Sequence, residues 1–145
     1  MKDLNVRSFS AGTIPKPRFP FEFDFVSTGL LDIEIGCGVG MHPLRYAKEN
    51  PSRTLLAIEH TRTRFNTFKR SYDVAANGAP ENLKPIHANA IGFITHHIPE
   101  ASVDRYFLLY PNPNPKSLNQ RWHAMPFMEK ILATLKPGGT LLLCT

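Results

Sequence analysis

The sequence predicts an α/β protein in which helices cover both faces of a twisted, mostly parallel β-sheet. Short runs rich in Leu and Ile alternate along the chain with longer segments of helical composition. A glycine-rich turn directly follows the first run, and a glutamate follows the second. Apolar strands that alternate with helices in this way are typical of parallel sheets, because a parallel connection needs a crossover that is usually helical.

The first half of the chain contains two strand–helix units. The predicted elements are a strand at Leu30–Ile35, a helix at about Met41–Asn50, a strand at Thr54–Ile58 and a helix at about Thr61–Ala76. Pro51 ends the first helix, because proline lacks the N–H that would continue the hydrogen bonding. Thr61 is a suitable N-cap for the second helix, and Asn77-Gly78 is typical of its end.

The second half continues the alternation. The predicted elements are a strand at Leu83–His87, a short helix at Ala90–His97, a strand at Val103–Tyr110, a helix at Arg121–Leu135 and a strand at Thr140–Cys144. Alternate prolines at Pro111, Pro113 and Pro115 predict a rigid loop after the fourth strand. The sequence LKPGG, from Leu135 to Gly139, predicts the end of the last helix.

One domain is expected at residues 30–145, incomplete at its C-terminus, after an irregular lead-in at residues 1–29. Alternating phenylalanines in the lead-in, from Phe19 to Phe25, predict an edge strand or an arm packed on the domain. The sequence has no apolar run near the roughly 20 residues of a membrane span, and no signal peptide is expected. Its two cysteines predict reduced thiols and a cytoplasmic location.

The turn at Glu34–Gly40 is the sharpest motif in the chain. Its alternate glycines allow a tight turn and the close approach of a ligand. Glu59 ends the second strand, where a carboxylate can accept hydrogen bonds from both hydroxyls of a ribose. The third glycine of a dinucleotide fingerprint would fall at Met41, and Glu34 favours a cationic ligand over a pyrophosphate. S-adenosylmethionine, with its sulfonium and ammonium groups, is therefore the predicted cofactor.

Two further segments follow strands at the same edge of the sheet. Asn89 ends the third strand, where its amide can bond adenine, cap the next helix or do both. In the loop after the fourth strand, Asn112 offers donors and an acceptor, and Lys116 offers a cation for a phosphate. Arg121, followed by Trp and His, combines charge with a stacking surface that suits a nucleotide. The alternative for this loop is a rigid surface segment without chemistry.

These motifs resemble the tRNA (guanine-N7)-methyltransferases, a class I, Rossmann-like family that uses S-adenosylmethionine. The resemblance covers Leu31 to Thr145 and rests on LDIEIGCGVG, AIEHTRTRF, YPNPNPK and LKPGGTLLLCT. The candidate cofactor-binding residues at the matching positions are Glu34, Gly36, Cys37, Gly38, Glu59, His60, Asn89, Ala90 and Asn112. The resemblance also implies a catalytic place for Asn112, near the methyl group and the base, and substrate binding by Lys116 and Arg121.

The chain departs from the family pattern at several of these positions. Asn112 and Asn114 replace the aspartate and tryptophan of the family's Asp-Pro-Trp core, and Asn89 stands where the family has an acid. A carboxylate accepts from both N–H groups on the guanine edge, whereas an amide does not, a discrimination of about 1–3 kcal/mol. The family's substrate contacts beyond the fifth strand would follow Thr145, so the fold is expected to lack its last two strands.

The charge distribution favours RNA as the partner. Seven Lys and Arg residues but only two Glu lie between Met41 and Arg70, and the net charge is +5. A solvated helix surface is the alternative interpretation of this cluster. The expected function is methylation of guanine N7 in tRNA. The alternatives are a methyltransferase for small molecules or proteins, and a non-enzymatic RNA-binding protein on a degenerate scaffold.

Other features receive plainer interpretations. His96 and His97 are adjacent and have no third ligand at metal-binding spacing, so no metal site is expected. His42 flanks the expected pocket, and a surface position is the favoured interpretation for it. The uncovered edge of the fifth strand predicts either a fragment or a homo-oligomer.

Overall fold

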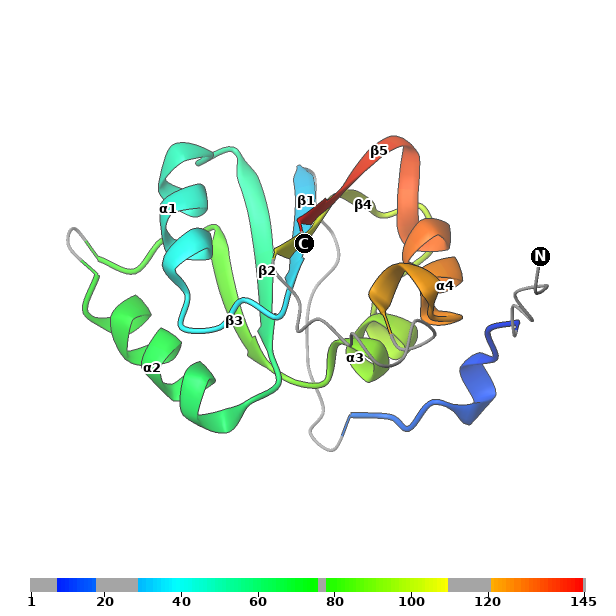
Figure 1. The fold of residues 1–145 in the computed structure, drawn as a ribbon. Coiled ribbons are helices and arrows are strands. Elements are labelled where there is room, and N and C mark those ends of the chain that lie inside the picture. The colour runs from blue at the N-terminus through cyan, green and yellow to red at the C-terminus, as the bar shows by residue number, and fades with distance from the viewer. Residues whose placement is uncertain (1–7, 18–28, 76–77, 110–120, 145) are drawn as a thin grey trace.

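The strands of the described residues lie in one parallel sheet. The computed structural model describes residues 8–17, 29–75, 78–109 and 121–144. The strand order is β3-β2-β1-β4-β5, and each neighbouring pair is parallel (Figure 1). The strands are β1 (Leu30–Ile35), β2 (Arg53–Glu59), β3 (Leu83–His87), β4 (Val103–Leu109) and β5 (Leu135–Cys144). The strand order reverses between β1 and β4, and ligands of such sheets bind beside this point, outside the carboxyl ends of the strands.

Helices cover both faces of the sheet, as predicted (Figure 1). The helices α1 (Met41–Glu49) and α2 (Arg62–Asp73) pack on one face, and α3 (Ala90–His97) and α4 (Phe127–Thr134) pack on the other. The short 3-10 helices are η1 (Ala11–Thr13) and η3 (Trp122–Ala124). This arrangement confirms the predicted α/β, Rossmann-like architecture.

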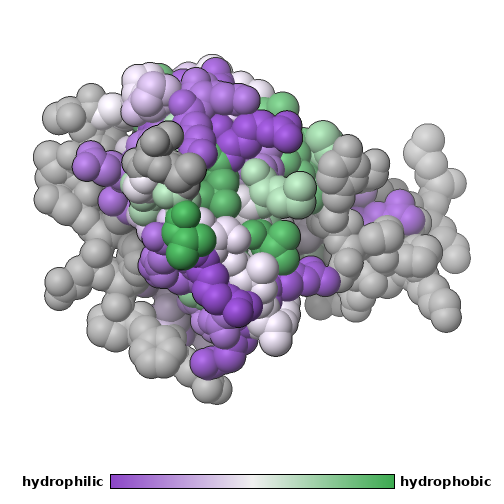
Figure 2. All heavy atoms as spheres, turned by 90° about the vertical axis from the view of Figure 1, so that its left-hand side faces the viewer, coloured by the Kyte–Doolittle hydropathy of each residue, from purple (hydrophilic) through white to green (hydrophobic). Residues whose placement is uncertain are grey.

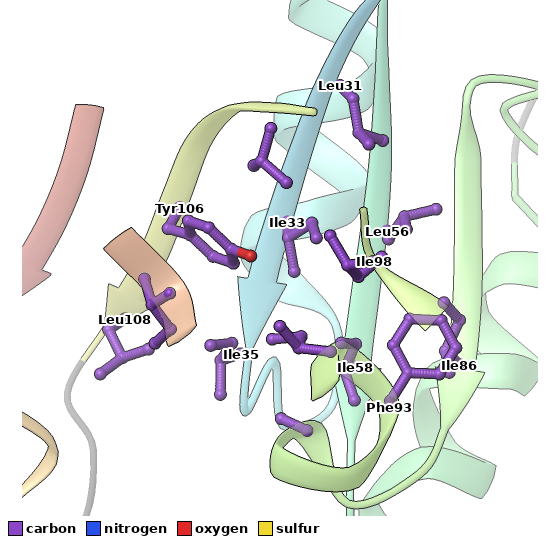
Figure 3. Packing of buried hydrophobic residues seen from close by; sticks show 14 of the residues in the cluster. Leu31, Ile33, Ile35, Leu56, Ile58, Ile86, Phe93, Ile98, Tyr106 and Leu108 are labelled. Atoms are coloured by element: carbon purple, nitrogen blue, oxygen red, sulfur yellow. The ribbon is translucent and has the colours of Figure 1, made fainter. Parts of the chain in front are cut away.

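The alternation along β1 divides its side chains between the two faces. Leu31, Ile33 and Ile35 enter the larger core, which lies between the sheet and α3 and α4 (Figure 3). Asp32 and Glu34 point to the opposite face, where each contacts a side chain of α1. The first strand therefore carries hydrophobic packing on one side and two buried carboxylates on the other.

The predicted and observed boundaries agree closely for most elements. The strands β1 and β3 and the helix α3 match residue for residue, α1 ends one residue earlier than predicted, and β2 is one residue longer at each end. The strand β4 begins at Val103 as predicted, and its predicted last residue, Tyr110, lies outside the described residues. Thr61 occupies the N-cap position of α2, but its side chain makes no capping hydrogen bond.

The prediction for Arg121–Leu135 was wrong in extent. The structure has η3 first, and α4 begins only at Phe127. Met125, with ψ of 146°, is extended because the residue before a proline disfavours the helical region, and Pro126 stands at the start of α4.

The LKPGG segment was predicted as the end of the last helix, and this prediction was wrong. It lies within β5, where Leu135 pairs with Val103 but Thr140 pairs with Arg105, so extra residues of β5 bulge between these pairs. Gly138 has φ of +80°, and a Cβ on Gly139 would lie 2.8 Å from Leu135 Cδ2. Two consecutive glycines suit a strand bulge as well as the end of a helix. The sequence alone therefore did not distinguish between these two structures.

The described part of the lead-in packs against α3 and α4. The Phe9 ring lies 6.1 Å from that of Phe127, and the Phe9 N–H donates to Glu129 at 3.1 Å. His96 Nε2 donates to the Ile14 carbonyl at 2.7 Å. The phenylalanines at 19–25 lie outside the described residues.

Candidate functional site

A pocket of about 200 Å³ lies at the carboxyl ends of β1, β2 and β3. Its lining includes five of the predicted cofactor-binding residues, Gly36, Glu59, His60, Asn89 and Ala90, together with Trp122. These residues come from three different strand ends, as the prediction requires. The fold therefore brings together residues that the sequence separates by more than fifty positions.

The glycine turn leaves open space on one side and packs tightly on the other. A Cβ added at Gly36 or Gly38 would meet no atom within 4 Å, so the backbone here can be approached by a ligand. Gly40 has φ of +89°, and a Cβ there would lie 2.0 Å from the buried ring of Phe68 on α2. Gly40 thus performs the close packing that the third glycine of a dinucleotide fingerprint performs one position later.

Glu59 organises the backbone around this turn. Its Oε2 accepts a hydrogen bond from the Gly38 N–H at 2.7 Å, and its Oε1 accepts one from the Thr61 N–H at 2.8 Å. The residue is only 4% exposed. Each carboxylate oxygen can accept more than one hydrogen bond, so Glu59 retains acceptor capacity beside the pocket that it lines.

Glu34 is buried at the start of the turn. Its Oε1 lies 2.7 Å from His42 Nδ1, and the residue is 2% exposed. Its Oε2 is shielded from solvent and has no hydrogen-bond partner among the described residues. His42 also packs against Phe107, with ring centroids 5.1 Å apart. The surface position favoured for His42 from the sequence was therefore an incomplete description, since its imidazole holds a buried carboxylate.

The two carboxylates make the turn electrostatically negative. Burial, followed by the charges of Glu34 and Glu59, raises the pKa of the Cys37 thiol far above its usual range. Cys37 is therefore a neutral thiol rather than a nucleophile. A site with this field disfavours a pyrophosphate and favours a cation.

Asn89 caps α3, as one of its two predicted roles requires. Its Oδ1 accepts a hydrogen bond from the Ile91 N–H at 2.9 Å. The side-chain NH₂ group makes no hydrogen bond that the structure records among the described residues. The proposed bond to adenine and the observed cap therefore use different atoms of the same amide.

A larger cavity of about 630 Å³ adjoins the first and shares His60 and Asn89 with it. Its lining includes the lead-in residues Ile14 to Pro17 together with Arg62 and His87. Lys16 and Arg62 contribute positive charge, and the described residues that line this cavity include no carboxylate. Sequence reasoning missed this cavity, because only the folded chain brings the lead-in to the end of β3.

The remaining predicted residues have different outcomes. Asn112 and Lys116 fall in 110–120, outside the described residues. Arg121 directly precedes η3, and the next residue, Trp122, lines the smaller pocket. Glu34, Cys37 and Gly38 belong to the glycine turn but are not among the residues that line either cavity.

Metal-binding clusters and membrane-spanning helices are both absent from the described residues. No group of three His, Cys, Asp or Glu side chains in those segments is placed to hold a metal ion. In the same part of the chain, no helix combines the length and the apolar character needed to cross a membrane.

Comparison with known proteins gives relatives that are longer than this chain. A tRNA (guanine-N(7)-)-methyltransferase of Roseobacter denitrificans is 30% identical over 115 residues, which make up 78% of this chain and 48% of that protein. A protein of the same name from an Arthrobacter species is 29% identical over an alignment that covers 98% of this chain and 45% of that protein. The chain thus spans about half the length of the curated relatives it matches.

Comparison with solved structures supports the fold. The 16S rRNA methyltransferase KamB is similar with a TM-score of 0.59 and 26% sequence identity, over 79% of this chain and 51% of that chain. A family model described as "Putative methyltransferase" matches residues 29–145, from the residue before β1 to the last residue of the sequence. On that match, which covers the whole described sheet, the chain belongs to this methyltransferase family.

Proposed function

We propose that this chain is the S-adenosylmethionine-binding part of an RNA methyltransferase, and that guanine N7 of tRNA is its target. The observation that carries the proposal is the open glycine turn between two buried carboxylates, Glu34 and Glu59, at the carboxyl ends of β1 and β2. The unpaired Oε2 of Glu34 and the free space at Gly36 and Gly38 suit a cationic ligand. The names of the curated relatives support the choice of tRNA.

In this proposal, residues at the ends of the three strands contact different parts of the cofactor. Glu34, Gly36, Cys37 and Gly38 hold the methionine end, Glu59 and His60 hold the ribose, and Asn89 and Ala90 contact the adenine. The bound cofactor supplies an electrophilic methyl group on sulfur. The described residues contribute binding, orientation and exclusion of water, which lower the barrier by alignment.

Methylation at guanine N7 requires little acid–base help, because N7 has an available lone pair. Asn112 is proposed to lie near the methyl group and the base, with Lys116 and Arg121 on substrate phosphates. The amide of Asn112 accepts fewer guanine donors than a carboxylate does, so discrimination between bases is expected to be weaker.

The face formed by α1 and α2 is proposed to contact the RNA backbone. Hydrophilic residues cover much of the described part of this face, with hydrophobic residues between them (Figure 2). The exposed cations on the two helices are Arg45, Lys48, Arg62, Arg64 and Arg70. Arg53 does not contribute, because its guanidinium bonds both oxygens of the buried Asp32 at 2.7 Å. Lys69 is paired with Asp73.

Two further parts of the proposal concern location and assembly. A cytoplasmic location agrees with the two free cysteines, Cys37 and Cys144. Self-association through β5, one of the two edge strands of the described sheet, remains a prediction.

Calorimetric titration of the 145-residue chain with S-adenosylmethionine tests the cofactor site. We expect micromolar binding, and we expect Glu59→Gln to weaken it by about tenfold or more, because an amide replaces one acceptor oxygen with a donor. Asp73→Asn removes an exposed carboxylate on α2 and is the matched control. Equal affinities for wild type and Glu59→Gln would remove the ribose assignment.

Transfer of radiolabelled methyl groups to total tRNA tests the substrate. Incorporation into tRNA supports the proposal, and mapping to N7 of guanine completes it. Cofactor binding without transfer to RNA favours a small-molecule or protein substrate. Binding of tRNA without transfer favours the non-enzymatic alternative.

A further inference from the structure

His42 is a residue for which neither the family resemblance nor the proposed cofactor contacts provide a role. It is the second residue of α1, two positions after the glycine turn, and its side chain is 35% exposed. Its Nδ1 lies 2.7 Å from Glu34 Oε1, within the range of a charge-assisted hydrogen bond. We take Nδ1 as the donor in this bond and the Glu34 carboxylate as the acceptor.

Two aromatic side chains fix the His42 ring in place. The ring centroid lies 5.1 Å from that of Phe107 on β4 and 5.5 Å from that of Tyr46, one turn further along α1. Phe107 and Tyr46 are also in edge-to-face contact with each other at 4.9 Å. The imidazole therefore reaches Glu34 from a packed position rather than from a freely rotating side chain.

The bond to His42 leaves the two oxygens of Glu34 in different states. Oε1 has a donor, whereas Oε2 is shielded from solvent and has none among the described residues. A buried carboxylate oxygen without a donor is costly, so it favours any cationic donor that reaches it. The charge of Glu34 extends to the glycine turn, since it contributes to the raised pKa of Cys37.

We infer that His42 is a positioning residue for cofactor binding, which holds Glu34 through Oε1 so that Oε2 is left for the positively charged methionine end of the cofactor. The inference rests on the proposed cofactor site. It adds that recognition of the charged end of the ligand, but not of its adenosine, depends on a histidine that does not itself need to touch the ligand.

The test compares two ligands and three variants by calorimetry. S-adenosylmethionine carries the charged methionine end, and 5′-methylthioadenosine carries the adenosine without it. His42→Leu removes the donor, His42→Asn keeps an N–H donor close to the position of Nδ1, and Tyr46→Phe alters a neighbouring contact without touching Glu34. Thermal unfolding by circular dichroism shows whether each variant is folded.

We expect His42→Leu to weaken S-adenosylmethionine by about tenfold, the size of one hydrogen bond to a charged group, and to leave 5′-methylthioadenosine unchanged. His42→Asn should restore most of the affinity, and Tyr46→Phe should bind like the wild type. Nitrogen NMR of the wild-type imidazole should show a protonated Nδ1.

Other results would overturn the inference. If His42→Leu weakened both ligands equally, the histidine would only shape the turn. If His42→Leu changed neither affinity, ligand binding would not depend on the hydrogen bond between His42 and Glu34. If the wild-type chain bound neither ligand, the proposed function would fail and this inference with it, which is a different result from either of the first two.

Discussion

The carboxylate of Asp104, on β4, accepts a hydrogen bond from the backbone N–H of Leu31 on β1 at 2.8 Å and another from Lys136 on β5 at 3.0 Å. One side chain thus connects three neighbouring strands. Burial by itself would raise the pKa of this carboxyl, but the Leu31 N–H and the Lys136 ammonium outweigh it, and the pKa is lowered. A group whose pKa is lower in the folded state contributes stability above its unfolded pKa.

Asp104→Asn is therefore expected to lower the free energy of unfolding at pH 7 by about 1–2 kcal/mol. The stabilisation by Asp104 is present above about pH 4, the usual pKa of an aspartate, and is lost as the pH falls through the lower folded value. Urea unfolding at several pH values should show the variant and the wild type converging as the pH falls through the lowered folded pKa of Asp104. Asp73→Asn, in an exposed pair, is the control and should change little. A gap between wild type and Asp104→Asn that persisted undiminished in acid would contradict this account.

The residues of the site differ in how readily the sequence predicts them. Glu34 and Glu59 could be identified because Glu59 ends a strand and Glu34 is the residue before the end of one, and strand ends are simple to locate. The link between Glu34 and His42 could not be seen, because it depends on how α1 turns back over the sheet. Lys16 and Arg62 line the same cavity only because the lead-in packs across α3. No local sequence pattern predicts this packing.

At the scale of elements, α2 begins in an electrostatically unfavourable way. Arg62 is its first residue and Arg64 its third, and the first turn contains no acid. The positive end of the helix dipole lies at this terminus, so both cations oppose it. Arg70, in the last turn, has the favourable arrangement. Cations kept at the unfavourable end agree with a role in binding an anion such as RNA.

Arg62→Glu should consequently raise stability and weaken RNA binding in the same variant. We expect a gain of about 0.3–1 kcal/mol from the helix dipole, and a lower affinity for tRNA in filter binding. Arg70→Glu is the same substitution at the other end of the same helix, and it should lower stability. A loss of RNA affinity combined with increased stability cannot result from unfolding. If Arg62→Glu left tRNA affinity unchanged, the contact between α2 and RNA would be excluded.

Most elements were predictable because their ends carry local signals. The strands β1 and β3 end at a glycine turn and at a helix cap, and both were located correctly. The region from Arg121 to Gly139 was predicted less well, because its signals are ambiguous. Pro126 is equally compatible with the first turn of a helix or a break before it. The glycines at 138 and 139 occur in a strand bulge here, and only pairing with β4 decides that outcome.

At the scale of the whole molecule, the helices α1 and α2 together carry a group of exposed cations. The chain has 17 Lys and Arg residues against 12 Asp and Glu. Two ion pairs involving Arg53 and Lys69 remove these residues from the cationic surface. The remaining exposed cations of α1 and α2 lie on the face opposite to α3 and α4. The cofactor site at the strand ends and the cationic face are therefore separate features that can be tested independently.

A triple variant, Arg45→Gln, Arg64→Gln and Arg70→Gln, tests this separation. Each phosphate contact contributes about 0.7–0.9 to the slope of log K against log salt, so the triple variant should reduce the slope for tRNA by about 2 if these residues bind phosphates. Filter binding between about 50 and 200 mM salt measures the slope. The affinity for S-adenosylmethionine should stay at the wild-type value, because none of the three residues lines either cavity. Equal slopes for the variant and the wild type would show that RNA binds elsewhere, and a parallel loss of cofactor affinity would show that the substitutions disturb the fold.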